Sequence, residues 1–193
     1  MSVVSKNTEA VLRQFAERVV KAAKLNLGAT RTITYNDGKK KRRRQVSSGK
    51  LKDSIDYSLN TGVHLLMSFQ MEDYGKFIDE GVSGTKYKVP GGSRFGFGAS
   101  ASKGEPTRLE SIKKWMKTKN IKARDLKTKS FVKQTDANID KAAFLISRSI
   151  KQKGIPKSEF FQAPFRMEFA KLPEEVLKAV SMDVDEFLKF TKR

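Results

Sequence analysis

An apolar stripe near the N-terminus constrains the fold of this chain more than any other feature of the sequence. Between residues 8 and 26, apolar side chains recur three or four positions apart. They are Val11, Leu12, Phe15, Ala16, Val19, Val20 and Ala23. Side chains at this spacing share one face of an α-helix. The stripe therefore predicts a long amphipathic helix, capped by Asn7 or Thr8 and ended by Gly28, whose apolar side needs a partner layer.

Strand signals can supply that partner layer. In "TRTITYNDGKKKRRRQV", residues 30–46, apolar residues alternate before an Asn-Asp-Gly turn signature, which predicts an exposed hairpin with a basic second arm. The stretch "GVHLLMSFQM", residues 62–71, has the composition of a strand, and "YGKFIDEGV", residues 74–82, holds a second buried segment. The aromatic stretch "KSEFFQAPFRMEF", residues 157–169, is expected to be extended.

Helical periodicity returns in the second half of the chain. It predicts a basic helix in "TRLESIKKWMKTKNI", residues 107–121, with Trp115 on its apolar side, and further helices at about 136–152 and 173–190. Residues 83–106 contain six glycines and are expected to form a long loop or an ordered excursion.

Together these elements predict an α+β fold. We expect the long N-terminal helix to pack on a curved antiparallel sheet, with additional helices in an insertion and at the C-terminus. A chain of 193 residues suffices for one domain with a real core. We therefore interpret residues 1–193 as a single domain, with a core at about 8–82 and 158–190 and a basic insertion at about 83–156.

Positive charge is concentrated in two parts of the chain. The formal net charge is +19, and residues 31–60 and 85–135 together carry +17 of it. The densest point is the uninterrupted run of six cations from Lys39 to Arg44. Clustering of this kind indicates a polyanionic neighbour rather than general solubility.

The residues needed for common catalytic sites are missing from the sequence. There is no cysteine, and the single histidine, His64, lies in an apolar stretch, which argues against a catalytic triad or a zinc site. The acidic residues Glu72, Asp73, Asp79 and Glu80 could hold Mg²⁺ as a nuclease does, but acids flanking a buried segment are more often solvated. We expect no enzyme, no cofactor and no metal, and no apolar run is long enough to span a membrane.

Three separated stretches resemble the tail-completion or neck proteins of tailed bacteriophages, a family of small tail components. Members of that family carry "TGxLxxSI", "YAxYVExGT" and "PFLxPA" in this order. The counterparts here are "SGKLKDSI" (residues 48–55), "YGKFIDEGV" (74–82) and "FFQAPFRMEF" (160–169). The resemblance covers roughly residues 8–82 and 158–190.

The resemblance implies a structural virion protein that forms a ring at the head–tail junction. Its expected partners are further copies, six or twelve to a ring, together with neighbouring portal, adaptor or tail proteins. We expect assembly in the host cytoplasm and a final location in the neck or tail of the virion. The motif residues are then scaffold positions: Gly49, Leu51, Ile55, Tyr74, Phe77, Gly81, Pro164 and Phe165.

Candidate contacts with DNA or with an acidic partner are the exposed cations of two segments. They are Lys39, Lys40, Lys41, Arg42, Arg43 and Arg44, and on the basic helix Lys113, Lys114, Lys117 and Lys119. Trp115 among these lysines could stack on a base, although its helical spacing favours the core. The six-residue run could also be a solvated loop. A nucleic-acid-binding protein without sequence preference is the alternative function, and it accounts for the charge but not for the three motifs.

Overall fold

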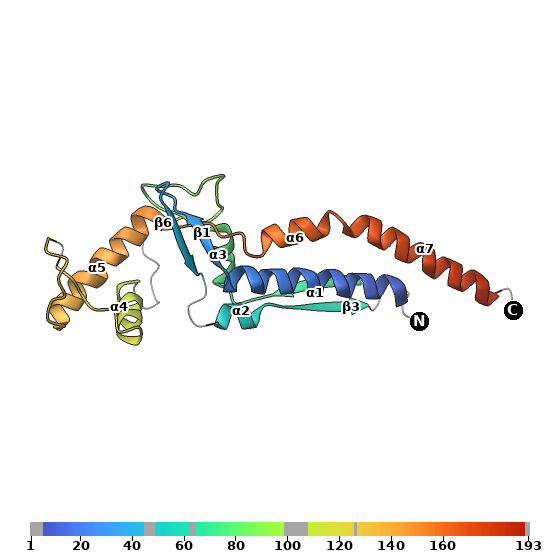
Figure 1. The fold of residues 1–193 in the computed structure, drawn as a ribbon, viewed down its shortest axis with the longest axis horizontal. Helices are drawn as coiled ribbons and strands as arrows, with labels where there is room; N and C mark the ends of the chain where they lie inside the picture. The colour runs from blue at the N-terminus through green and yellow to red at the C-terminus, as the bar shows by residue number, and fades with distance from the viewer. Residues whose placement is uncertain (1–5, 45–48, 62–64, 99–107, 126, 192–193) are drawn as a thin grey trace. The chain divides into compact units, whose positions relative to one another are not determined.

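The computed structural model describes residues 6–44, 49–61, 65–98, 108–125 and 127–191 (Figure 1). The chain divides into two compact units. Unit 1 comprises Met1–Ile33, Lys41–Asp79 and Ser158–Arg193, and unit 2 comprises Thr34–Lys40 and Glu80–Lys157. The long segment of unit 2 begins and ends within three residues of the insertion expected from the sequence at 83–156.

Unit 1 is built around the N-terminal helix. Helix α1 (Lys6–Gly28) is followed by α2 (Lys50–Ser54), the strands β3 (Asp56–Thr61) and β4 (Leu65–Gln70), and helix α3 (Gly75–Glu80). The chain returns as α6 (Gln162–Phe169) and α7 (Leu172–Thr191). Figure 1 shows α1 running between the β3–β4 pair and the two C-terminal helices, and α1 contacts β3, α6 and α7. The predicted long helix and its need for partner layers are confirmed.

Strands β3 and β4 form an antiparallel ribbon whose register runs from Asp56 opposite Gln70 to Thr61 opposite Leu65. Alternate residues of β3 are half-buried, as expected for a strand with one packed face. Tyr57 and Phe69 lie directly opposite each other, and both pack against the core of unit 1. The sequence predicted β4 but not β3.

The sheets are smaller than the sequence predicted. The described residues contain three two-stranded pairs: β1 (Thr30–Thr34) with β2 (Lys40–Arg44), β3 with β4, and β5 (Val82–Ser83) with β6 (Gly154–Ile155). No single curved sheet is present in these ranges. Helix α2 separates β2 from β3 along the chain, and α3 separates β4 from β5, so successive pairs are not continued into one another.

Unit 2 has its own small core between two helices. Helix α4 (Arg108–Thr118) packs on α5 (Asp136–Lys153), and Ile112, Met116 and Ala143 are buried where they meet. Trp115 points elsewhere and is 46% exposed, so its expected place in the core is wrong. The reason is helical geometry, because Met116 rather than Trp115 continues the stripe begun by Ile112 at a spacing of four.

One further expectation needs correction, and for the glycine-rich segment one of the two expected alternatives is observed. The stretch at residues 157–169 is not extended throughout, because Gln162–Phe169 is helix α6. Part of the glycine-rich segment at 83–106 is an ordered excursion: the backbone amide of Ser83 donates to the Phe95 carbonyl, and that of Phe97 donates to the Ser83 carbonyl. Residues 99–107 lie outside the described part. No helix in the described ranges is long and apolar enough to cross a bilayer.

Candidate functional site

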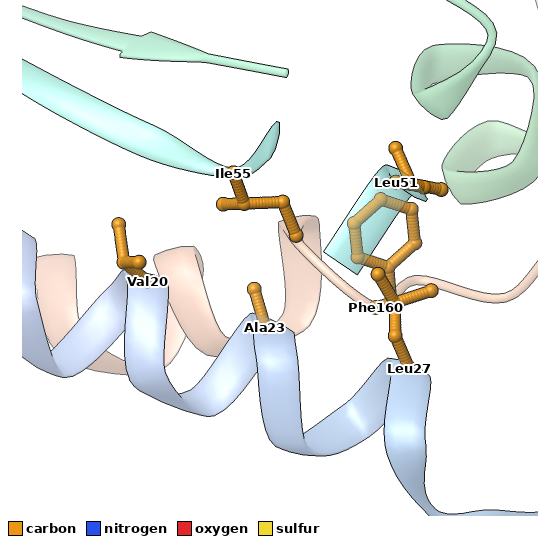
Figure 2. Close-up of a cluster of buried hydrophobic side chains, with 6 residues drawn as sticks. All are labelled: Val20, Ala23, Leu27, Leu51, Ile55 and Phe160. Carbon is orange, nitrogen blue, oxygen red and sulfur yellow. The ribbon is translucent and has the colours of Figure 1, made fainter. Parts of the chain in front are cut away.

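The stretches that carry the family resemblance meet in one core cluster of unit 1. Its buried members are Val20, Ala23, Leu27, Leu51, Ile55 and Phe160. Figure 2 shows Leu51 and Ile55, from the first motif, facing the side chains of α1, with Phe160 from the third motif closing the cluster. Ile78, from the second motif, packs against the same cluster. The three motifs are thus neighbours in space although they span more than a hundred residues of sequence.

Two motif glycines have backbone conformations that other residues adopt only with strain. Gly49 precedes α2 with φ 85°, and Gly81 follows α3 with φ 75°. A Cβ on Gly81 would also lie 2.8 Å from the Lys157 amide nitrogen and 2.9 Å from the Ile155 carbonyl oxygen. Gly81 therefore permits both the turn out of α3 and the close approach of the returning chain.

Asp79 joins the second motif to the third, which the sequence analysis did not anticipate. Its side chain was expected at a polar edge but is only 4% exposed. The Phe161 amide donates to its Oδ1 at 2.8 Å, and the Gln162 amide donates to its Oδ2 at 3.2 Å. These amides begin α6, so the carboxylate caps a helix from 82 residues away and complements its positive end. The sequence signal that could have indicated this role was the position of Asp79 directly after the apolar residues Phe77 and Ile78.

The remaining scaffold positions divide between the core and the surface. Pro164 is buried in the first turn of α6, where a missing amide hydrogen leaves no helical bond unmade. Phe165 is half-buried, stacks on Phe161 and Phe169, and meets the rings of Phe15 and Phe69 edge-on. Phe77 is half-buried, but Tyr74 is 39% exposed and does not supply core as expected.

Helix α7 is fixed to α1 by polar contacts at two places. Asp183 accepts hydrogen bonds from the backbone amides of Asn7 and Thr8, each at 3.1 Å, and from the Thr8 hydroxyl at 2.8 Å. Asp183, rather than Asn7 or Thr8, thus caps the start of α1. In the middle of α1, Arg18 donates to Glu168 of α6 at 2.6 Å and to Glu175 of α7 at 2.7 Å. Hydrogen bonds from Lys171 and Arg18 lower the pKa of Glu168.

The face of α7 that does not contact α1 carries a second apolar stripe. Ala179, on the inner face, is buried, whereas a set of large apolar side chains on the outer face is exposed. This outer stripe consists of Leu177, Val180, Val184, Phe187 and Leu188. Leu177 is 73% and Phe187 65% exposed. The sequence predicted an amphipathic helix here, but the apolar residues are too many for one stripe, which was the overlooked signal.

A groove of about 440 Å³ lies on another part of unit 1. Its wall is formed by α1, α2 and β3, and its apolar floor includes Val20 and the exposed Leu25. Three lysines, Lys21, Lys24 and Lys52, and one acid, Glu17, line it. The groove therefore offers an apolar surface with a positive rim.

The basic run forms the second strand of a hairpin, as predicted. Gly38 adopts φ 80° in the turn, and the Tyr35 amide donates to the Lys39 carbonyl at 2.8 Å. Lys39, Lys40, Lys41 and Arg42 are exposed, whereas the side chains of Arg43 and Arg44 lie outside the described part. Neighbouring residues of a strand point to opposite faces, so the run cannot form one six-charge stripe.

The turn of this hairpin belongs to unit 2 and is hydrogen-bonded to other residues of that unit. The Asn36 amide nitrogen Nδ2 donates to the carbonyls of Val82 and Lys153, at 3.1 and 2.8 Å. Lys153 Nζ lies 3.0 Å from Asp37 Oδ2. The hydrogen bond from Lys153 is the main cause that lowers the pKa of Asp37.

The candidate lysines of α4 are not equivalent. Lys113 is half-buried and pairs with Asp140 of α5 at 2.7 Å, so its charge is engaged within the unit. Lys114, Lys117 and Lys119 are exposed and remain candidates for contact with a polyanion.

The acids considered for a metal site have other roles. Glu72 pairs with Lys50 at 3.1 Å, Glu80 pairs with Arg94 at 2.6 Å, and Asp79 caps α6. Within the described ranges, no group of three or more acidic or histidine side chains is placed to hold a metal ion. His64 lies outside those ranges.

Comparison with models of protein families, with curated proteins and with solved structures yields no match to this chain.

Proposed function

We propose that this chain is a structural virion protein of a tailed bacteriophage, a neck or tail-completion ring component at the head–tail junction. The convergence of the three motifs on one core supports the resemblance, because each motif contributes to the same structural unit. On this proposal the protein is not an enzyme and needs no cofactor. Its work is to bind copies of itself and its neighbours in the virion.

The outer stripe of α7 is the observation that carries the proposal. Leu177, Val180, Val184 and Phe187 follow one another at spacings of three, four and three, which is the spacing of a helix seam that packs against a partner. Contiguous apolar surface of this kind marks an interaction site on a soluble protein. A nucleic-acid-binding protein, the alternative function, has no need of such a stripe.

We further propose that the outer stripe of one copy docks into the lysine-lined groove of the next. Of the five carboxylates of α7, Glu175 and Asp183 bind α1 of the same copy, which leaves Glu174, Asp185 and Glu186 for a neighbour. The groove carries Lys21, Lys24 and Lys52 with one acid, Glu17. The two surfaces are therefore complementary in both apolar character and charge. Because they are different surfaces of one unit, the contact is head-to-tail, which closes a ring when the rotation between copies allows it.

Ring closure also offers a route to the single curved sheet predicted from the sequence. The β3–β4 ribbon is two-stranded, so it presents backbone groups at its edges that another strand can pair with. On this proposal, ribbons of successive copies join edge to edge in the ring of six or twelve. The same assembly would contact portal, adaptor or tail proteins above and below, and genomic DNA without sequence preference.

Light scattering combined with negative-stain imaging tests the subunit contact. We expect the wild type to reach a mass that is a multiple of 21.8 kDa and to form rings as concentration rises. The double variant Leu177→Ser/Val184→Ser should stay at the monomer mass, and Lys21→Glu/Lys24→Glu should assemble more weakly.

Met182→Ser is the matched control, because Met182 is 47% exposed on the same helix but lies outside the outer stripe. It should assemble as the wild type does. A wild type that remains monomeric at every concentration and is absent from purified phage particles would contradict the proposal. Loss of assembly in the control as strong as in the stripe variant would contradict the assigned surface.

A further inference from the structure

A second hairpin, which lies in unit 2 and is separate from the basic run, presents cations around an exposed aromatic ring. We call it the basic finger and define it as residues 122–125 and 127–133. Its two arms pair through a bridge between Arg124 and Phe131, and the Val132 amide donates to the Ala123 carbonyl at 3.2 Å. The Asp125 amide donates to the Ser130 carbonyl at 2.9 Å. The backbone of the finger is thus hydrogen-bonded along its length.

The finger is anchored to the helix that follows it. Gln134 accepts a hydrogen bond from the Ala123 amide at 3.0 Å and donates to the Val132 carbonyl at 2.6 Å. The Asn138 side chain, in α5, donates to the Lys133 carbonyl at 2.9 Å. Ala123 is buried. The backbone of the finger is therefore attached to the start of α5.

Five cations and one acid lie in the finger. The cations are Lys122, Arg124, Lys127, Lys129 and Lys133. The acid, Asp125, is occupied by the turn itself, since its Oδ1 accepts hydrogen bonds from the amides of Lys127 and Thr128, each at 2.8 Å. Lys122, Arg124, Lys127 and Lys133 are all exposed. The acid serves the turn and the cations face solvent.

An aromatic ring lies at the centre of this charge. Phe131 is 61% exposed, with the Arg124 guanidinium carbon 4.3 Å and the Lys122 Nζ 6.0 Å from its ring centroid. Beside the finger is an open cavity of about 480 Å³, which Arg124, Lys127 and Lys141 line together with the exposed ring of Phe144. An exposed phenyl ring makes no hydrogen bonds to water, so covering it with another flat ring is favourable. The cations beside it can bind phosphates, so the site suits a ligand that has both phosphates and flat rings.

We propose that the basic finger binds single-stranded nucleic acid, with phosphates on Lys122, Arg124 and Lys127 and a base stacked on Phe131. Stacking on an aromatic side chain requires a base whose face is free. A duplex hides those faces within its own stack, so it can use the cations but not the ring. The inference does not rest on the ring of subunits proposed above. The finger lies wholly in unit 2, and none of its residues belongs to the outer stripe or the groove.

Fluorescence anisotropy with labelled oligothymidylate of about 20 nucleotides, a length that exceeds one small binding site, tests the aromatic contact. A duplex of equal length is the second probe. Phe131→Leu should weaken binding to the single strand about tenfold, the effect of losing one stacked base, and should leave duplex binding within about twofold. Phe131→Trp, which keeps an aromatic ring at this position, should bind the single strand as the wild type does. Because Phe131 is exposed, both variants should keep the wild-type melting temperature.

Salt titrations of the same complex test the cations. The double variant Lys122→Gln/Lys127→Gln should lower the slope of log affinity against log salt by about 1.4, or about 0.7 for each phosphate that is no longer neutralised. The control Lys86→Gln/Lys88→Gln removes the same charge elsewhere in unit 2 and should leave the slope unchanged. Equal losses of affinity in the two double variants, or equal weakening of single-strand and duplex binding in Phe131→Leu, would overturn the proposal.

Discussion

Three carboxylates of this protein join parts of the chain that are far apart in sequence. Asp79 caps α6, Asp183 caps α1, and Asp37 pairs with Lys153 across 116 residues. In each case a short side chain binds groups that would otherwise lack a partner, either helix-end amides or a cation. A carboxylate is suited to this role because its two oxygens can accept from two donors at once.

Asp79→Ala should destabilise unit 1 by about 1–3 kcal/mol, because it removes a helix cap and leaves two amides of α6 unbonded in a buried place. Urea unfolding followed by circular dichroism measures the change. Asp73→Ala, which alters an exposed acid in the same segment, is the control and should change stability little. A midpoint for Asp79→Ala equal to that of the control would show that the cap is not needed.

The stability of unit 2 should depend on pH through Asp37. Its pKa is lowered in the folded protein, chiefly by the hydrogen bond from Lys153. A carboxyl with a lowered folded pKa contributes stability above its unfolded pKa, and that contribution is lost as pH falls through the folded pKa. Thermal unfolding of wild type and Asp37→Asn should therefore differ most near neutral pH, and the difference should shrink as pH falls below about 4 and disappear below the lowered folded pKa.

Asp185→Asn is the control for this series, since Asp185 is an exposed acid outside the first and last turns of its helix. It should follow the wild type at every pH. If the difference between Asp37→Asn and the wild type stayed constant from neutral to acid pH, the ion pair would not be the cause of the stability change.

At the scale of elements, α7 and the β1–β2 hairpin each have two sides with different roles. The inner face of α7 is fixed on α1 through Ala179, Glu175 and Asp183, while its outer stripe faces away. The turn of the hairpin is tied to unit 2 through Asn36 and Asp37, while its cations are exposed. In both elements one side holds the position and the other is available to a partner.

Replacing the six residues from Lys39 to Arg44 with Ser should leave the fold intact, because the described side chains of the run are exposed. It should weaken duplex binding and lower its salt slope by about 0.9 for each phosphate that the run neutralises in the wild type. Electrophoretic mobility shifts over a salt series measure both effects. In particles, the defect in genome retention or ring docking should resemble that of raised salt.

Lys178→Ser/Lys189→Ser, which removes two exposed cations of α7, is the comparison for the effect of net charge alone. It should have less effect per charge than the hairpin variant. A hairpin variant that binds duplex as the wild type does at every salt concentration, and whose particles hold their genomes equally well, would leave the run as a solvated strand.

Across the whole molecule, charge is divided unevenly between the two units. Unit 2 contains 21 of the 40 Lys and Arg but only 7 of the 21 Asp and Glu, which places +14 of the +19 net charge there. The outer stripe and the lysine-lined groove both belong to unit 1. This division supports the assignment of subunit contacts to unit 1 and of most polyanion contacts to unit 2.

The sequence by itself determined those features that depend on neighbours along the chain. The stripe of α1 follows from a spacing of three and four, the hairpin turn from Asn-Asp-Gly, and the positions of α5 and α7 from the same periodicity. Gly49 and Gly81, which the motifs marked as scaffold positions, both adopt a positive φ, a local backbone conformation that glycine reaches without strain. The bounds expected for the basic insertion, about 83–156, came from the positions of the second and third motifs of the resemblance.

Only the tertiary structure decided which side chains meet. Contacts between residues far apart in the sequence decide three features. They are the burial of Asp79, the cap that Asp183 provides for α1, and the helix at residues 162–169. A carboxylate looks the same in a sequence whether it is solvated or caps a distant helix. Periodicity likewise reports that α7 is amphipathic, but it cannot tell which apolar face packs on α1 and which stays exposed. That choice follows from the three-dimensional packing of α1, α6 and α7, because burying one face of a helix leaves the other to a partner.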